Sequence, residues 1–155
     1  MAKRWFEESK NSFGSTRLSF DHEDTYSMKY NAVWDKLFGL NLFPDSFYEN
    51  EVNCYFDKMN PYGLPLDNRE DYTKSDWHLW CATFTKGKEE FERFIAPLWD
   101  AYDKSPSRVP MTDWFSSITA IKCNFQHRSV QGGLWIHILE NRGICKLNVP
   151  ISERF

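Results

Sequence analysis

The sequence predicts an all-α fold in which helical hairpins are joined by alternating short and long connections. Apolar residues recur at helical intervals in several segments, and no period-two alternation typical of strands persists over several residues. Prolines and glycines interrupt the apolar segments where helices are expected to end. The length of 155 residues fits one domain or a large part of one.

The first half of the chain is expected to contain the end of a helix, one long loop and two complete helices. Residues 1–11 are typical of the end of a helix, and residues 13–26 of a loop. Apolar residues at helical spacing predict a helix over 30–42. Pro44 suits the first turn of the next helix, which is expected to run to Asn60 before a Pro-Tyr-Gly stop.

The second half is expected to contain three more helices and two functional loops. A third helix is predicted at about 75–85, capped by the Ser75 side chain. Gly87 separates it from a fourth, whose apolar stripe contains Phe91, Phe94, Ile95, Leu98, Trp99 and Tyr102. The loops RVPMTDWF and FQHRSVQGG follow, and a last helix is expected to begin near Gly132.

Composition excludes several classes of function. A net charge of -3 and the lack of a basic stripe argue against nucleic acid as a partner. The apolar runs are far shorter than the roughly 18–20 residues of a membrane span, so no membrane partner is expected. The N-terminal residues MAKRWFEESKNS have no apolar stretch, so they are not a secretory signal. Four scattered cysteines without CxxC spacing favour structural thiols over zinc ligands or disulfides.

The chain is rich in aromatic residues, with 13 Phe, 7 Trp and 7 Tyr, although its mean hydropathy is only -0.62. Large rings alternating with charges suit an aromatic-lined cleft for a saccharide or another small polar substrate. The alternative is that the rings only fill the interfaces between helices.

Polar and aromatic side chains are concentrated in the segment 62–80, YGLPLDNREDYTKSDWHLW. Pro65 restricts its own φ and the residue before it, so Gly63-Leu64-Pro65 should be a stiff, non-helical connector. Asp67 and Arg69 then lie on a rigid loop that precedes a helix with Asp76 in its first turn, where a carboxylate is favoured. This segment is therefore the main candidate site.

Four motifs in order resemble the glutaminase A family, and together they cover roughly residues 3–140. The motifs are TYSMKYNAVWDKLFGLNLFP (25–44), YGLPLDNREDYTKSDWHLW (62–80), RVPMTDWF (108–115) and FQHRSVQGGLW (125–135). The match is to the C-terminal part of that family's central six-helical-hairpin domain. The resemblance implies part of an (α/α)6 toroid, as in six-hairpin glycosidases, with a pocket at one end, and a hydrolase centred on L-glutamine.

The resemblance also implies that the chain is a partial domain. Residues 1–140 correspond to part of the toroid, and 141–155 are a tail without a family match. Because a partial ring leaves apolar helix faces uncovered, we expect self-association. No cofactor is implied, and the resemblance leaves a secreted or periplasmic compartment open for the complete protein.

Hydrolysis of an amide or glycosidic bond needs one group that protonates the leaving group and one that activates water. Asp67, Asp76 and Asp113 are the candidate catalytic carboxylates, because each lies in a family motif. Asp76 could instead only stabilise a helix start, and Asp113 could only cap a turn. Asp67 is the least easily explained by the needs of the local backbone.

Arg69 and Arg128 are candidate substrate-binding residues, since each could grip a carboxylate through two parallel hydrogen bonds. The equal alternative is that they pair with the aspartates and hold the loops together. The other substrate-binding candidates are aromatic: Tyr72, Trp77 and Trp114. No metal site is predicted, because His78 and His127 lie apart from each other and from cysteine. No GxSxG pattern is present, which disfavours a serine hydrolase.

Three hypotheses remain open. The first is part of a glutaminase A-like hydrolase that uses carboxylate acid/base chemistry in the complete protein. The second is a catalytically silent remnant that serves as a ligand-binding or interaction module. The third is a six-hairpin glycoside hydrolase.

Overall fold

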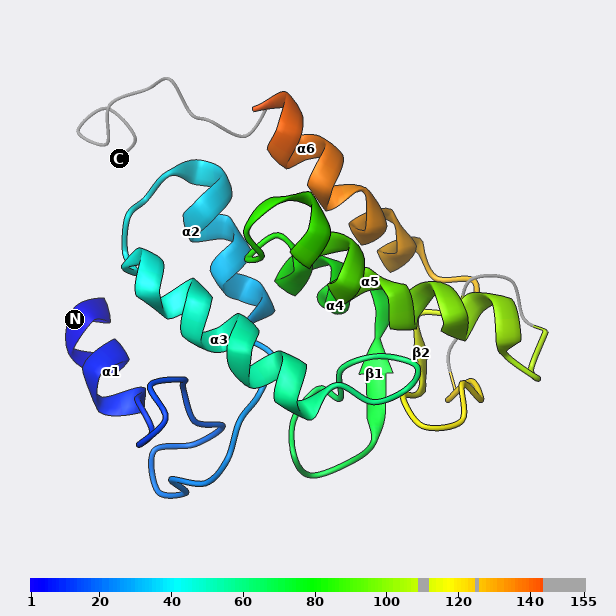
Figure 1. The fold of residues 1–155 in the computed structure, drawn as a ribbon, viewed down its shortest axis with the longest axis horizontal. Helices are drawn as coiled ribbons and strands as arrows, with labels where there is room; N and C mark the ends of the chain where they lie inside the picture. The colour runs from blue at the N-terminus through cyan, green and yellow to red at the C-terminus, as the bar shows by residue number, and fades with distance from the viewer. Residues whose placement is uncertain (109–111, 125, 144–155) are drawn as a thin grey trace.

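The computed structural model describes residues 1–108, 112–124 and 126–143, and this part of the chain is largely helical (Figure 1). Within it, six α-helices and two 3-10 helices follow in chain order: α1 (Ala2–Ser9), η1 (Tyr30–Ala32), α2 (Val33–Phe38), α3 (Asp45–Lys58), α4 (Ser75–Ala82), α5 (Gly87–Lys104), η2 (Ser129–Trp135) and α6 (Ile136–Arg142). The helical class is confirmed, whereas the toroid stays a prediction.

The prediction of an all-α fold is wrong in one respect. Two short strands, β1 (Tyr72–Lys74) and β2 (Trp114–Ser116), form an antiparallel pair in which Tyr72 lies opposite Ser116 and Lys74 opposite Trp114. Strands of three residues are too short for period-two alternation to be visible in the sequence. Their pairing also depends on contacts between segments that are far apart along the chain.

Several helix boundaries differ from the expected ones. The segment expected as one helix over 30–42 begins as η1, and α2 stops at Phe38 because Gly39 has φ +62° and ends the helix in the left-handed conformation. The third helix stops at Ala82, short of the predicted residue 85. The last segment also differs, because the residues around Gly132 form η2 and the α-helix starts only at Ile136.

The predicted apolar stripe of α5 is correct for Phe94 and Leu98, which are buried, and wrong for Trp99, which is 74% exposed. Successive residues of a helix lie about 100° apart, so Trp99 follows buried Leu98 onto a different face.

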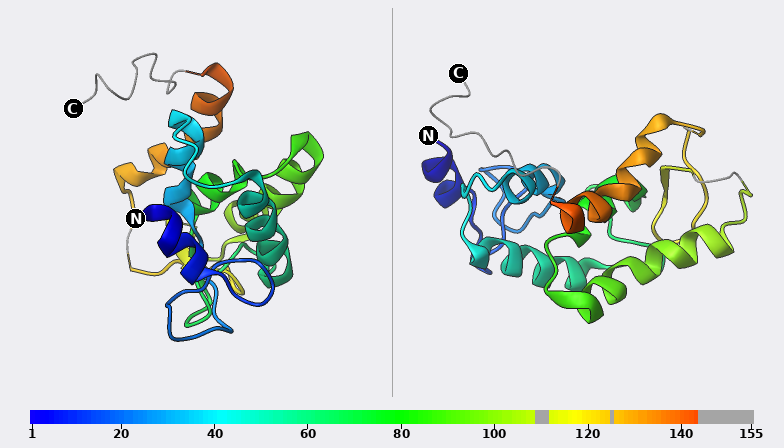
Figure 2. Two further views of the ribbon diagram at one scale, coloured as in Figure 1. Left: turned by 90° about the vertical axis from the view of Figure 1, so that its left-hand side faces the viewer. Right: turned by 90° about the horizontal axis from the view of Figure 1, so that it is seen from above.

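Helix α4 lies at the centre of the fold and packs against η1, α5, η2 and α6. Figure 2 shows η2 and α6 as one continuous helical segment on one side of the molecule. The core beneath these helices includes Val33, Tyr55, Leu64 and Phe94, all fully buried. The elements that surround α4 therefore come from both halves of the chain.

Three cysteines, Cys54, Cys81 and Cys123, are free thiols, and of these Cys81 is buried. Cys145 lies outside the described residues. So does the tail predicted over 141–155 from residue 144 onward.

Candidate functional site

The connector that opens the segment 62–80 is fixed in the core. Gly63 has φ +134°, and a Cβ at this position would lie 3.3 Å from Thr73 Cγ2 and 3.4 Å from His78 Nδ1. The next residue, Leu64, is fully buried. A side chain at Gly63 would be both strained and crowded, so this position requires glycine.

The small sheet brings Asp113 to the start of α4. Lys74, the last residue of β1, lies opposite Trp114, the first residue of β2. The backbone N–H of Ser75 donates to the carbonyl oxygen of Asp113 over 3.0 Å. Two of the predicted catalytic residues, Asp76 and Asp113, therefore meet at the junction of β1 and α4.

Asp113 is a fully buried carboxylate that contacts two cations. Lys74 Nζ lies 3.2 Å from Asp113 Oδ2, and Arg128 Nη1 lies 3.5 Å from the same oxygen. A buried carboxylate without such partners would be strongly destabilising. The pairing of Arg128 with an aspartate is one of the two roles that the sequence left open for it.

Asp76 lies in the first turn of α4 and is almost fully buried. Burial raises the pKa of Asp76, and the negative charge of Asp113 adds to the rise, while backbone N–H groups at the helix start and Lys74 oppose it. The surroundings of the Asp76 carboxyl group thus favour its protonated form.

Within the described part of the chain, one oxygen atom of each of these two carboxyl groups finds no hydrogen-bond partner. Among the described residues, Oδ1 of Asp76 and Oδ1 of Asp113 are buried and accept no hydrogen bond. Buried polar atoms in native proteins are nearly always paired, so such exceptions need an explanation. A catalytic role, in which water or substrate occupies these positions, is one explanation.

The aromatic candidates surround Lys74. Its Nζ lies 5.5 Å from the ring centroid of Trp77 and 5.1 Å from that of Trp114. Tyr72 meets Trp114 edge to face, with centroids 5.2 Å apart. The two indole rings therefore make cation–π contacts with the Lys74 ammonium group, which also contacts Asp113.

Trp77 also lines a pocket of about 690 Å³. It stacks on Tyr30, with ring centroids 4.0 Å apart and an interplanar angle of 6°. Asp67 and Arg69 line the same pocket. Trp77 is thus the residue that the pocket and the Lys74–Asp113 cluster share.

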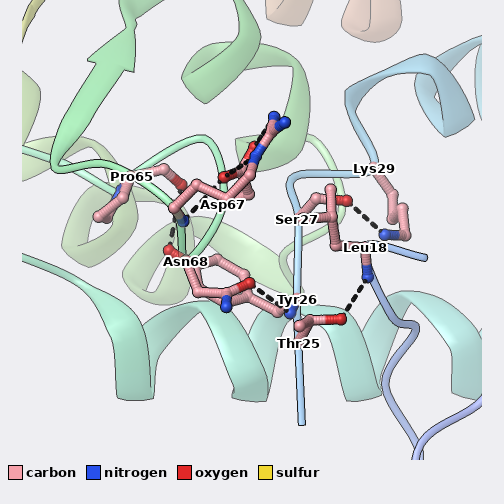
Figure 3. A network of polar contacts seen from close by, with 9 residues as sticks. Leu18, Thr25, Tyr26, Ser27, Lys29, Pro65, Asp67 and Asn68 are labelled. Atoms are coloured by element: carbon pink, nitrogen blue, oxygen red, sulfur yellow. Dashed lines mark hydrogen bonds and ion pairs between the residues drawn. The ribbon is translucent and has the colours of Figure 1, made fainter. Parts of the chain in front are cut away.

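Asp67 is held by Arg69. Arg69 donates from Nε to Oδ1 over 2.9 Å, from Nη2 to Oδ2 over 2.7 Å, and from its backbone N–H to Oδ1 over 2.9 Å. These hydrogen bonds lower the pKa of Asp67, against the effect of burial. Figure 3 shows Asp67 and Asn68 beside Tyr26 and Ser27 of the preceding loop.

These contacts give Arg69 the loop-holding role that the sequence left open. The bidentate hydrogen bonds that Arg69 could offer to a substrate carboxylate are made to Asp67.

The helical segment after residue 128 packs tightly on α4. A Cβ at Gly133 would lie 2.7 Å from Asp76 Cβ and 2.9 Å from Trp80 Nε1. The indole N–H of Trp80 donates to the carbonyl oxygen of Gly133 over 3.2 Å. The close packing of η2 on α4 thus buries Asp76, and it is possible because Gly133 has no side chain.

The predicted capping role of Ser75 is wrong. Ser75 is the first residue of α4, and its hydroxyl donates to Gln131 Oε1 over 3.2 Å. Tyr102 donates to the same oxygen over 3.2 Å. The N-cap position belongs to Lys74, one residue before Ser75, so the Ser75 hydroxyl does not cap the helix. It instead connects α4 to η2.

His78 has a structural environment. It is fully buried, and it accepts a hydrogen bond from the Leu64 N–H at Nδ1 over 3.3 Å and lies 2.9 Å from the Phe94 carbonyl oxygen through Nε2. Burial lowers its pKa to about 4. Both nitrogens are used by the backbone, as in a neutral histidine with its proton on Nε2.

The described residues contain neither a metal-binding cluster nor a membrane-spanning helix. No group of three or more His, Cys, Asp and Glu side chains is arranged to hold a metal ion there. In the same part of the chain, no helix is long and apolar enough to cross a membrane.

Sequence reasoning did not select Tyr30, Gln131 or Tyr102 as site residues, and it interpreted Lys29 as a hydrogen-bonding residue between helices. Lys29 and Tyr30 line the pocket, and Gln131 and Tyr102 join η2 and α5 next to Asp76. Lys29, Tyr30 and Gln131 lie inside two of the four motifs, which was the available signal.

Comparisons with known proteins agree with the motifs. The family model described as the glutaminase A six helical-hairpin domain matches residues 1–138. The chain is 32% identical over 123 residues to Glutaminase A of Aspergillus oryzae (strain ATCC 42149 / RIB 40), an alignment that covers 76% of this chain and 17% of that protein. The chain thus spans less than a fifth of the length of this curated relative. No solved structure matches the chain.

Proposed function

The chain belongs to the glutaminase A six helical-hairpin family, and from this premise we propose that it carries the acid/base residues of a glutaminase A-like hydrolase. In this proposal the complete protein hydrolyses the side-chain amide of L-glutamine. The observation that carries it is the buried Asp76–Asp113 pair, in which each carboxyl group keeps one oxygen without a partner among the described residues.

The two carboxyl groups have different surroundings, as an acid and a base require. Burial and the neighbouring negative charge raise the pKa of Asp76, so it serves as the acid that protonates the leaving nitrogen. Asp113, ion-paired with Lys74 and Arg128, serves as the base that takes a proton from water. The water oxygen bonds to the amide carbon, the C–N bond breaks, and ammonia leaves with the proton from Asp76.

Asp67 has a different role in this proposal. Its carboxylate is engaged by Arg69 and lines the pocket, so it shapes the place where the substrate binds.

The test is ammonia release from L-glutamine by the complete protein. Asp76→Asn and Asp113→Asn are each expected to lower kcat by about 100-fold or more, the usual contribution of a general acid or base. Asp100→Asn is the matched control, because the Asp100 side chain on α5 is 43% exposed and pairs only with Lys104 among the described residues. Circular dichroism verifies that the variants are folded.

Full activity in both Asn variants would refute the assignment. Absence of turnover in the unmutated complete protein would instead favour a silent ligand-binding module, for which the internally satisfied Asp67–Arg69 pair is the supporting observation.

A six-hairpin glycoside hydrolase is the second catalytic candidate. The stacked Tyr30–Trp77 pair at the pocket favours it, because sugar rings bind well against aromatic faces. Release of reducing sugar from a panel of glycosides, without ammonia release from glutamine, would select this alternative.

A further inference from the structure

The pocket beside Trp77 has a charge pattern that the acid/base pair does not explain. It lies between the segment 27–43, which contains η1 and α2, and the loop that carries Asp67. Its lining is mostly apolar and aromatic, and includes Met28, Trp34 and Leu66. Four charged residues also line it: Lys29, Asp35, Asp67 and Arg69.

Both carboxylates of the pocket are already engaged. Asp35 accepts hydrogen bonds from the Leu42 N–H over 2.8 Å, the Phe43 N–H over 3.2 Å and the Tyr48 hydroxyl over 2.7 Å. Asp67 accepts three hydrogen bonds from Arg69. Neither carboxylate is thus available as the main acceptor for a ligand.

The cations, by contrast, have hydrogen-bond donors to spare. Lys29 Nζ donates to the Arg17 carbonyl oxygen over 2.8 Å and to Ser27 Oγ over 2.6 Å, which uses two of its three N–H groups. Arg69 engages Asp67 through Nε and Nη2, and among the described residues its Nη1 donates to no acceptor. The pocket therefore offers unused hydrogen-bond donors on two cationic side chains to whatever enters it.

The position of Lys29 strengthens this pattern. Its ammonium group is held by two short hydrogen bonds beside Asp67, as Figure 3 shows for its contact with Ser27. Burial lowers the pKa of Lys29, while the charges of Glu51 and Asp67 oppose that change. An anion in the pocket would offset the cost of burying this ammonium group.

We propose that the pocket binds the carboxylate group of a small organic acid, with Lys29 as the main cation and the apolar wall beside Trp77 in contact with the carbon chain. Arg69 Nη1 is the second donor. This inference rests on the proposed function in one respect, namely that the bound acid is the substrate. It favours a substrate with a carboxylate, such as an amino acid, over a neutral saccharide.

The test is calorimetric titration of the 155-residue chain with three ligands of similar length. L-Glutamine and glutaramate both have a carboxylate, and glutaramate lacks the α-amino group. Glutaminol has a hydroxymethyl group in place of the carboxylate. We expect both acids to bind about tenfold more tightly than glutaminol, the ratio typical of one charge-assisted hydrogen bond.

Variants at Lys29 test the assigned cation. Lys29→Met is expected to weaken binding of both acids about tenfold and leave glutaminol unchanged, whereas Lys29→Arg should retain acid binding because it keeps the charge. Lys104→Met, on the exposed end of α5, is the control and should bind like the unmutated chain. Thermal unfolding shows which variants fold.

Equal affinity for glutaminol and the acids would overturn the proposal without any variant. Unchanged acid binding in folded Lys29→Met would also overturn it. Asp113→Asn separates this inference from the proposed function, because it should lower kcat of the complete protein by about 100-fold or more and leave glutaramate binding to the folded chain intact. Carboxylate binding without hydrolysis would support the inference and refute only the catalytic assignment.

Discussion

The packing of η2 on α4 makes a sharp prediction at Gly133. A methyl group there would lie 2.7 Å from Asp76 Cβ and 2.9 Å from Trp80 Nε1, closer than real Cβ contacts come. One of these neighbours, the Asp76 Cβ, is bonded directly to the α4 backbone, so rotation of the side chain cannot move it away. Gly133→Ala should therefore push η2 off α4 and lower the free energy of unfolding by about 1–3 kcal/mol, the usual cost of overpacking.

Gly132 provides a matched control in the adjacent position. A Cβ at Gly132 meets nothing within 4 Å, and its φ is not in the left-handed region. Gly132→Ala should therefore change the free energy of unfolding by no more than about 0.5 kcal/mol, as for an unconstrained surface position.

Urea unfolding followed by tryptophan fluorescence measures both variants, with the slope compared to ensure that the same surface unfolds. Equal effects of the two substitutions would refute the reasoning. So would a stable Gly133→Ala variant, because η2 could then not be packed against Asp76 and Trp80 as described.

Two further predictions concern pH and association. The pKa of His78 is about 4 in the folded chain, below its usual value of 6.5, so the unfolded chain takes up a proton first as pH falls. The contribution of neutral His78 to the free energy of unfolding should be complete above pH 6.5 and decrease by about 3 kcal/mol as pH falls to 4. His78→Gln should reduce this pH dependence, whereas the exposed control His22→Gln should retain it. Urea titrations at several pH values measure the effect. Trp135 and Ile138, which are 64% and 43% exposed, should promote the self-association expected from the sequence. Sedimentation velocity should show concentration-dependent association that Trp135→Gln with Ile138→Gln reduces, and a monomer at all concentrations would contradict it.

The helices could be located from the sequence because their apolar residues repeat over several turns. The boundaries were less accessible, since α2 ends where Gly39 turns left-handed, inside a pattern that continues to residue 42. The small sheet was not predictable, because each strand has only three residues and its partner lies far along the chain.

The arrangement of the candidate site was not predictable from the sequence. Asp76 and Asp113 were identified from motifs, but only the β1–β2 pairing brings them together. Asp67 looked hardest to explain by local needs, yet Arg69, two residues away, satisfies its carboxylate. Side-chain pairing of this kind depends on loop geometry that no periodicity encodes.

Trp77 connects the proposed acid/base pair with the proposed binding pocket. Its indole contacts Lys74, which reaches Asp113, and it also stacks on Tyr30 at the pocket. The proposed acid Asp76 and the pocket-lining Trp77 are consecutive residues in the first turn of α4, so a displacement of this turn moves both. A shift of the helix start would therefore disturb the acid and the pocket at once, which is why the packing at Gly133 matters for the site as well as for stability.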